Sequence, residues 1–208
     1  MSFLTTAKVT WFDDGCCDVK YLDEWDRVPL SYRPGQAVDD SWYTDQYELK
    51  LGWDVSGKLF QIAAERLMAY QFYPEDVLHH VSDFGLNERR PYPGDRIVQR
   101  FHIFTLAGKP VVDVIGMNQI ESVCKEPRRV GFRYVTVETH VEQGEWSAYV
   151  TWDAQDDVAL TVHSISRPAP EEPARNHKFI RARQKEGHQR GLAYFQKTVL
   201  DAFESTPQ

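Results

Sequence analysis

The chain has 208 residues, of which 42% are hydrophobic and 26% are charged. This ordinary composition fits one globular domain, or one domain with an extension. The formal net charge of -7 disfavours nucleic acid as a partner, because surplus carboxylates repel phosphates. No stretch approaches the roughly 18 consecutive apolar residues of a membrane span, and the N-terminus lacks a leader pattern. We therefore expect a cytoplasmic protein that does not associate with membranes.

The cysteines and the short motifs predict neither disulfides nor a bound cofactor. Cys16, Cys17 and Cys124 cannot all pair with one another, so we expect free thiols in a reducing compartment. The sequence contains no Cys-x-x-Cys or His-Glu-x-x-His spacing and no glycine-rich phosphate loop. These absences predict that the protein holds no metal and no nucleotide cofactor.

Residues 1–45 are expected to form an N-terminal extension. Within it, two β-rich runs in residues 7–22 flank Asp14-Gly15, a dipeptide that accepts positive φ and favours a hairpin turn. Residues 23–45 are rich in Asp, Pro, Ser and Gly and lack periodicity, which indicates a loop. We therefore predict a β-hairpin and then a connecting loop before the main domain.

The main domain is expected to begin with a strand and two short helices. Residues 47–53 favour a strand, and apolar residues recur at helical spacing over residues 57–71. Pro74 then restarts the chain, and the acidic residues that follow it favour the first turn of a helix. We therefore predict a second short helix over residues 74–84.

The second half of the chain predicts a series of strands and then a long helix. Five β-rich segments between residues 96 and 167 are separated by short turns, which predicts an antiparallel meander. Residues 174–204 contain no proline, and their apolar residues keep helical spacing towards the C-terminal end. The charged stretch 181–190 is expected to face solvent. Together these elements predict an α+β fold.

Four segments resemble an uncharacterised family, domain of unknown function family 1990. In chain order they are LGWDVSGKLFQIAAERLMAYQFYP, PGDRIVQR, EPRRVGFRYVTVETHVEQGE and SISRP. The family is similar to the helix-grip superfamily of birch-pollen-allergen-like proteins and polyketide cyclases. The resemblance therefore implies a helix-grip domain over residues 46–208. In that fold a curved antiparallel sheet, with two short helices after its first strand, wraps around a long C-terminal helix and encloses an apolar cavity.

The candidates for catalysis lie at the end of the strand that begins near residue 130. Alternation places Glu138 and His140 on the same face of this strand. A carboxylate that orients an imidazole makes a general acid or base near neutral pH, so we predict these two residues as catalytic. The alternative is that both are solvated at the strand end or bind the next turn.

Aromatic residues and further histidines on the strands and the terminal helix are expected to line the cavity. The aromatic share of 13% suits a cavity wall, although the plain interpretation of the same residues is a large aromatic core. The predicted ligand-binding residues are Phe132, Tyr134, Tyr149, Phe195, His102 and His163.

Three functions fit these features. The first is an enzyme of specialised metabolism that binds a hydrophobic small molecule and catalyses a cyclisation, lyase or isomerase-type step, by analogy with the family's cyclase relatives. The second is a non-catalytic carrier of an apolar metabolite. The third is an interaction protein whose N-terminal aromatic residues contact a partner or a second copy, as in a homodimer. Those aromatic residues are Trp11, Phe12, Trp25, Trp42 and Tyr43.

Overall fold

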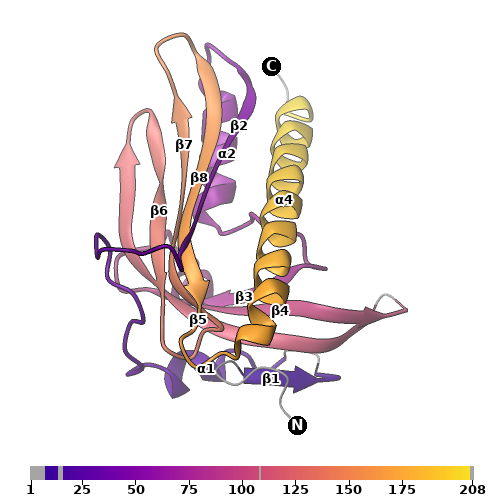
Figure 1. Cartoon of the computed structure of the whole chain (residues 1–208). Coiled ribbons are helices and arrows are strands. Elements are labelled where there is room, and N and C mark those ends of the chain that lie inside the picture. Colours follow the sequence, from indigo (N-terminus) through magenta and orange to yellow (C-terminus); the bar gives the residue numbers. More distant parts are fainter. Residues whose placement is uncertain (1–7, 14–15, 108, 207–208) are drawn as a thin grey trace.

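In residues 8–13, 16–107 and 109–206, which the computed structural model describes, eight antiparallel strands form a sheet that curves around a long C-terminal helix (Figure 1). The sheet order is β2-β8-β7-β6-β5-β4-β3, and β1 pairs with β5. The strands are β1 (Lys8–Trp11), β2 (Tyr43–Trp53), β3 (Leu78–Ser82), β4 (Arg96–Leu106), β5 (Lys109–Glu126), β6 (Arg129–Thr136), β7 (Glu142–Trp152) and β8 (Asp157–Pro168). The helices are α1 (Lys20–Glu24), α2 (Lys58–Met68), α3 (Asp83–Leu86) and α4 (Ala174–Glu204).

The predicted fold class is confirmed. The five expected strands are β4 to β8, each paired with the next along the chain, and α4 spans the predicted residues. Every second residue of β8 is buried, which places Val158, Leu160 and Val162 on the concave face towards α4. In the part of the chain that the structure describes, no helix is long and apolar enough to span a lipid bilayer.

Strand β5 is where the sheet changes direction. It pairs with β4 up to Gln119 and with β6 from Asn118 onwards. The register with β6 shifts between Ile120 and Ser122, and an irregularity of this kind bends a strand. In Figure 1, β3 and β4 consequently run across the N-terminal end of α4, whereas β6, β7 and β8 run alongside the helix.

The space between the sheet and the C-terminal half of α4 is filled by aromatic side chains. Phe72 contacts Trp146 and Phe195 with ring centroids 5.5 and 5.9 Å apart. Phe132 contacts Trp146 at 5.9 Å. Helix α2 lies against β6, β7 and α4 and closes this end. Tight packing of this kind leaves no room for a ligand.

Two glycines of α4 differ in what surrounds them. A β-carbon on Gly191 would lie 2.4 Å from Cε1 of Phe72, whereas a β-carbon on Gly187 would meet nothing within 4 Å. Gly191 therefore allows α4 to approach the filled core, and Gly187 borders open space.

This difference predicts opposite effects of the same substitution. Gly187→Ala should raise the free energy of unfolding by about 0.5–1 kcal/mol, because alanine is the better helix former. Gly191→Ala should lower it by about 1–2 kcal/mol, because the cost of overpacking exceeds that gain. Urea unfolding followed by circular dichroism measures both. Equal stabilisation by the two substitutions would contradict the close contact with Phe72.

The N-terminal hairpin predicted for residues 7–22 is wrong. Strand β1 pairs instead with residues 112–115 of β5, and helix α1 begins within the second half of the expected hairpin. The predicted turn residues 14–15 lie outside the described residues. The physical reason is long-range: β6 begins to pair with β5 only at Asn118, so an open strand edge precedes this residue and β1 occupies it.

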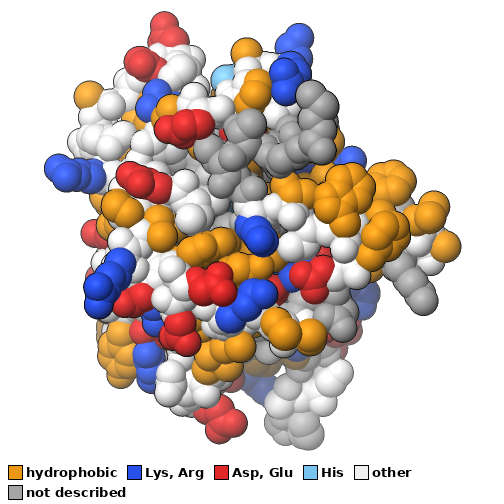
Figure 2. Space-filling model, turned by 90° about the horizontal axis from the view of Figure 1, so that it is seen from below, with side chains coloured by type: hydrophobic (Ala, Val, Ile, Leu, Met, Phe, Trp, Pro, Cys, Tyr) orange, Lys and Arg blue, Asp and Glu red, His pale blue; other side chains and the backbone are white. Residues whose placement is uncertain are grey.

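Part of the N-terminal aromatic set packs on the chain itself. Trp25 stacks on Tyr21 with ring centroids 4.6 Å apart. Trp11 and Phe12 are exposed, and Figure 2 shows hydrophobic side chains gathered on one projecting side of the molecule. Contact with a partner or a second copy through these residues stays a prediction, as does the division of the chain at residue 45.

The second short helix begins later than the sequence predicts. Strand β3 occupies the middle of residues 74–84 and pairs with β4, and the helix after it, α3, is only four residues long. Pairing with the edge of β4 overrides the local helix signal, because tertiary contacts outweigh weak propensities in a short segment.

Candidate functional site

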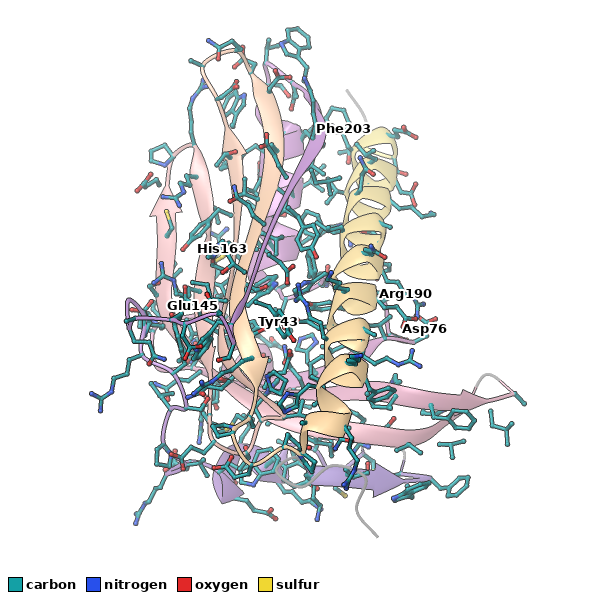
Figure 3. All side chains as sticks on the ribbon, in the orientation of Figure 1. Tyr43, Asp76, Glu145, His163, Arg190 and Phe203 are labelled. Carbon is teal, nitrogen blue, oxygen red and sulfur yellow. The ribbon has the colours of Figure 1, made fainter. Side chains whose placement is uncertain are left out.

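A cavity of about 410 Å³ lies between the N-terminal half of α4 and the concave face of the sheet. Side chains of β4 to β8, of α4 and of the loop before β3 line it. Figure 3 shows side chains of the sheet and of α4 pointing into the space between them. The volume lies in the range of small-molecule sites, roughly 300–1,000 Å³. The cavity implied by the resemblance is therefore present, beside the N-terminal half of the helix.

One row of residues crosses four strands in register on the concave face. Asp45 of β2 pairs with Ser164 of β8. Ser164 pairs in turn with Trp146 of β7, which pairs with Tyr134 of β6. The rings of Tyr134 and Trp146 stack with their centroids 5.1 Å apart. Because residues opposite each other in neighbouring strands share a face, the row presents a hydroxyl, an indole and a phenol to the cavity.

A buried amide network lies beside Tyr134. Gln99 of β4 donates hydrogen bonds to the hydroxyl of Tyr70 and, at 3.5 Å, to that of Tyr134. Asn118 of β5 donates from Nδ2 to Oε1 of Gln99 at 2.6 Å. These bonds fix the orientation of Gln99 and turn the oxygen of Asn118 away from it.

Four buried polar atoms on the cavity side have no hydrogen-bond partner among the described residues. They are Oδ1 of Asn118, Nε1 of Trp146, Oγ of Ser164 and Nδ1 of His188. Each belongs to a side chain of a residue that is at most 5% exposed. Buried polar groups are normally paired, and an unpaired one costs about 1–3 kcal/mol. A bound molecule with matching donors and acceptors would remove this cost.

His140 lies in the turn between β6 and β7, with its ring against Gly116 of β5. A β-carbon on Gly116 would lie 2.4 Å from Cδ2 of His140, so the glycine makes room for the imidazole. The amide of Glu142 lies 3.0 Å from Nδ1 of His140, and the carbonyl oxygen of Glu142 lies 3.1 Å from the same atom, so the turn backbone holds the ring in place. Burial lowers the pKa of His140 to about 4, so the ring is neutral at pH 7.

Glu142 brings a carboxyl group to the cavity. Its side chain lines the cavity, and the residue is partly exposed. Burial raises the pKa of Glu142 to about 8, while the Arg181 cation opposes this shift and Asp45 adds to it. The carboxyl group is therefore mostly protonated at pH 7 and able to donate a proton.

His188 projects from α4 into the same cavity. Its ring contacts Tyr47 edge-on at 5.5 Å. Burial lowers the pKa of His188 to about 4, an effect that Asp45 partly offsets. This histidine is therefore also neutral at pH 7 and has an unpaired Nδ1.

The predicted catalytic pair does not share a strand face. Strand β6 ends at Thr136, and Glu138 is exposed in the following turn, where its amide donates to the carbonyl of Pro29 at 3.0 Å. Alternation cannot be extended past the end of a strand, which is why the prediction of a shared face is wrong. The carboxyl group that enters the cavity near His140 belongs to Glu142. Catalysis by His140 stays a prediction.

Two of the predicted ligand-binding residues line the cavity, namely Tyr134 and His102. His102 is held by Asp113, whose Oδ1 lies 2.8 Å from Nδ1 of the ring. Within the described residues, no group of three or more His, Cys, Asp and Glu side chains is arranged to hold a metal ion.

The other four predicted ligand-binding residues lie elsewhere. Phe132 and Phe195 belong to the filled core beside the C-terminal half of α4. Tyr149 and His163 follow the buried core residues Ala148 and Val162 on their strands, so alternation turns them to the convex face. Figure 3 labels His163 on that side of the sheet, away from α4.

Sequence reasoning missed Glu142 and His188. It assigns no role to Glu142, and it places His188 in the charged stretch 181–190 facing solvent, which is wrong because His188 is 5% exposed. A signal for His188 exists: steps of three or four residues lead from Ile180 to His188 and Gly191, the spacing of one helix face. Because charged residues surround this stripe, the stretch 181–190 as a whole has a polar composition, which hides the buried face.

An ion pair crosses the rim of the cavity. An Nη atom of Arg190 on α4 lies 2.6 Å from Oδ2 of Asp76 in the loop before β3, and Figure 3 labels both residues. The two side chains are 42% and 70% exposed, so the pair contributes little stability. Its position joins the helix to the loop beside the cavity.

The fold and the cavity define a helix-grip protein with a pocket between the sheet and α4. Residues 30–193 match the family described as Domain of unknown function (DUF1990), and the chain belongs to this family. No curated protein has a sequence that matches this chain.

Solved structures resemble the chain in fold. A hypothetical protein from Helicobacter pylori is similar with a TM-score of 0.53 and 13% identity, over 83% of this chain and 95% of that chain. Norcoclaurine synthase from Thalictrum flavum, solved in complex with dopamine and hydroxybenzaldehyde, gives a TM-score of 0.48 and 12% identity, over 85% of this chain and 98% of that chain. At such identities the likeness concerns the fold alone.

Proposed function

We propose that the protein binds a small molecule in this cavity and transfers a proton on it, in a cyclisation, lyase or isomerase-type step. The observation that carries the proposal is the group of four unpaired buried polar atoms on residues that line the cavity, namely Asn118, Trp146, Ser164 and His188. Buried polar atoms in a filled core are rarely without a hydrogen-bond partner, because each unpaired atom lowers the stability of the fold. Their convergence on one cavity supports a bound ligand.

The proposed proton donor is Glu142. With a pKa of about 8 it holds its proton at neutral pH and is matched to proton transfer there. His140 has a pKa of about 4, so it serves as a neutral hydrogen-bonding group and not as a base. In this assignment the carboxyl group donates the proton itself. The sequence-based prediction is instead that a carboxylate orients the imidazole of His140, which transfers the proton.

A carrier without catalysis is the second candidate. It uses the same cavity and the same unpaired atoms, and it requires no proton transfer by Glu142. The separation of Glu138 from His140 favours it, because the acid-base pair expected from the sequence is not formed. Turnover of a bound compound separates the two candidates.

Filling the cavity tests the binding shared by both candidates. We expect Gly187→Trp to weaken binding of a compound found by thermal shift by about 100-fold, because the indole takes the volume of the ligand. Gly187→Ala is the matched control and should bind as the wild type does. Binding that survives the tryptophan takes place outside the cavity and contradicts the proposal.

The same compound then decides between enzyme and carrier. If wild-type protein converts it, Glu142→Gln should lower turnover by about 10²–10⁴, the contribution of one general acid or base. His140→Phe should retain more activity, because it removes a hydrogen bond and leaves the proton donor. Binding without turnover by the wild-type protein would favour the carrier, and full turnover by Glu142→Gln would contradict the role of this residue.

A further inference from the structure

We propose that the cavity selects an uncharged ligand, and that Asp45 enforces this selection by holding the cation of Arg181 away from the cavity. This inference rests on the proposed function, since it specifies the ligand of the same site. It concerns a specificity-determining residue on β2 that acts through a second residue on α4.

Five of the titratable groups that line the cavity are neutral at pH 7, whereas His102, which also lines it, is held by Asp113. Burial lowers the pKa values of His140 and His188 to about 4 and raises that of Glu142 to about 8. It also raises the pKa of Tyr134 to about 12 and that of Tyr73 well above its usual value. An ion that entered would lose its water and meet no opposite charge from these groups, which is unfavourable.

The charged side chains at the cavity rim are paired with each other. Arg183 lies 2.7 Å from Glu186, and Arg190 lies 2.6 Å from Asp76. Glu145 alternates with the inward Trp146, so its carboxyl group points to the convex face, where Figure 3 labels it. None of these pairs offers a free counter-charge to the interior.

Arg181 is the cation that could change this balance, and Asp45 holds it. An Nη atom of Arg181 donates to Oδ1 of Asp45 at 2.6 Å, and the other Nη atom donates to Oδ2. Gln184 accepts a further bond at 2.6 Å, and the guanidinium lies 4.4 Å above the ring of Tyr43. The two charged side chains are 15% and 11% exposed, so neither is strongly screened by solvent.

The position of Asp45 explains why its charge matters to the cavity. Asp45 begins the concave row and lies opposite Ser164, which lines the cavity. Both Arg181 and Asp45 act on the pKa of Glu142, in opposite directions, so the pair lies within electrostatic reach of the cavity carboxyl group. Without the aspartate charge, the field of Arg181 inside the cavity is no longer cancelled.

Two fluorescent probes with the same ring skeleton test the selection. N-phenyl-1-naphthylamine is uncharged, and 8-anilino-1-naphthalenesulfonate carries an added sulfonate. Wild-type protein should bind the uncharged probe at least about tenfold more tightly. Asp45→Asn keeps the shape of the side chain and removes its charge. It should tighten binding of the sulfonate probe by about tenfold and change binding of the uncharged probe by less than about threefold.

Matched variants separate this effect from a general loss of charge. Asp201→Asn removes a carboxylate from the exposed pair with Lys197, whose side chains are 73% and 59% exposed, and should leave both affinities unchanged. Arg181→Gln leaves Asp45 as an uncancelled anion, so it should weaken binding of the sulfonate probe below the wild-type level. Arg181→Gln therefore still tests the inference if circular dichroism shows that Asp45→Asn is unfolded.

The outcomes distinguish the inference from the function on which it rests. If neither probe binds, or if both still bind Gly187→Trp, the proposed cavity function fails and the inference fails with it. If the uncharged probe binds in the cavity but the sulfonate probe binds equally well, only the selection is overturned. It is also overturned if folded Asp45→Asn or Arg181→Gln leaves the affinity for the sulfonate probe unchanged.

Discussion

The free energy of unfolding should pass through a maximum near pH 6.5 and fall on both sides. Three histidines and one glutamate produce this shape. Burial lowers the pKa values of His80, His140 and His188 from 6.5 to about 4. It raises the pKa of Glu142 from 4.5 to about 8. The two kinds of shift act in opposite directions in overlapping pH ranges.

Between pH 4.5 and 6.5 the histidines dominate. The unfolded chain binds a proton at each of the three histidines that the folded protein excludes, and the folded protein retains one extra proton on Glu142. The unfolded state therefore binds two more protons, so stability rises with pH across this range, by about 5 kcal/mol at most. The carboxyl group of Glu145, whose pKa burial also raises, reduces this figure.

Above pH 6.5 only Glu142 continues to act. Its folded pKa is raised above the unfolded value, so the stabilisation present at low pH is lost as the carboxyl group ionises towards pH 8. The expected loss between pH 6.5 and 8 is about 2 kcal/mol. Carboxyl groups with lowered pKa values, such as those of Asp54 and Asp95, act only at lower pH.

Urea unfolding at a series of pH values measures both arms of the profile. Glu142→Gln cannot ionise, so its stability should stay level between pH 6.5 and 8. His188→Gln should flatten part of the acid arm and leave the alkaline arm unchanged. A wild-type profile that keeps rising to pH 8 would show that Glu142 ionises freely, and proton donation by this residue would then be untenable.

Replacing Arg100 by methionine should cost about 3–5 kcal/mol of stability, because the change strands two buried carboxylates. Arg100 is 2% exposed. Its Nε donates to Asp18 at 2.6 Å, and one Nη atom donates to Asp113 at 2.9 Å. The side chains of both aspartates are 3% exposed. Asp18 belongs to the N-terminal segment, so this cluster ties that segment to β4 and β5.

Lys197→Met is the matched control for Arg100→Met. It removes a cation from a pair whose side chains are 73% and 59% exposed, and it should change stability by less than about 0.5 kcal/mol. The comparison uses urea unfolding at pH 6.5. If the free energy of unfolding falls by less than about 0.5 kcal/mol in both variants, the N-terminal segment is not anchored through Arg100.

The elements that the sequence predicted well are those whose evidence is local. Period-two alternation identifies β8, and a helical stripe without proline identifies α4, because each element buries one face along its whole length. Residues 74–84 are too few to show such a pattern, and pairing with the edge of β4 determines their conformation. The pairing of β1 likewise depends on where β6 diverges from β5, which no short window of sequence contains.

The candidate site was predictable in part. The position of Tyr134 on the concave face follows from alternation within β6, and Gly116 inside a predicted strand signals that another group approaches the backbone closely. That the group is His140 depends on a turn geometry that the sequence does not specify. The raised pKa of Glu142 could not be anticipated either, because it arises from burial by elements distant in the chain.

The pairing of β1 with β5 also bears on aggregation. Residues 111–116 of β5 read VVDVIG, a β-prone segment with a single charge, and β1 covers the edge of residues 112–115 that β6 leaves open. An uncovered edge of this composition templates strands of other molecules. The region that matches the family begins at residue 30, after β1. A chain trimmed to that region would carry an unprotected strand beside its cavity, so we expect it to self-associate more readily than the full chain.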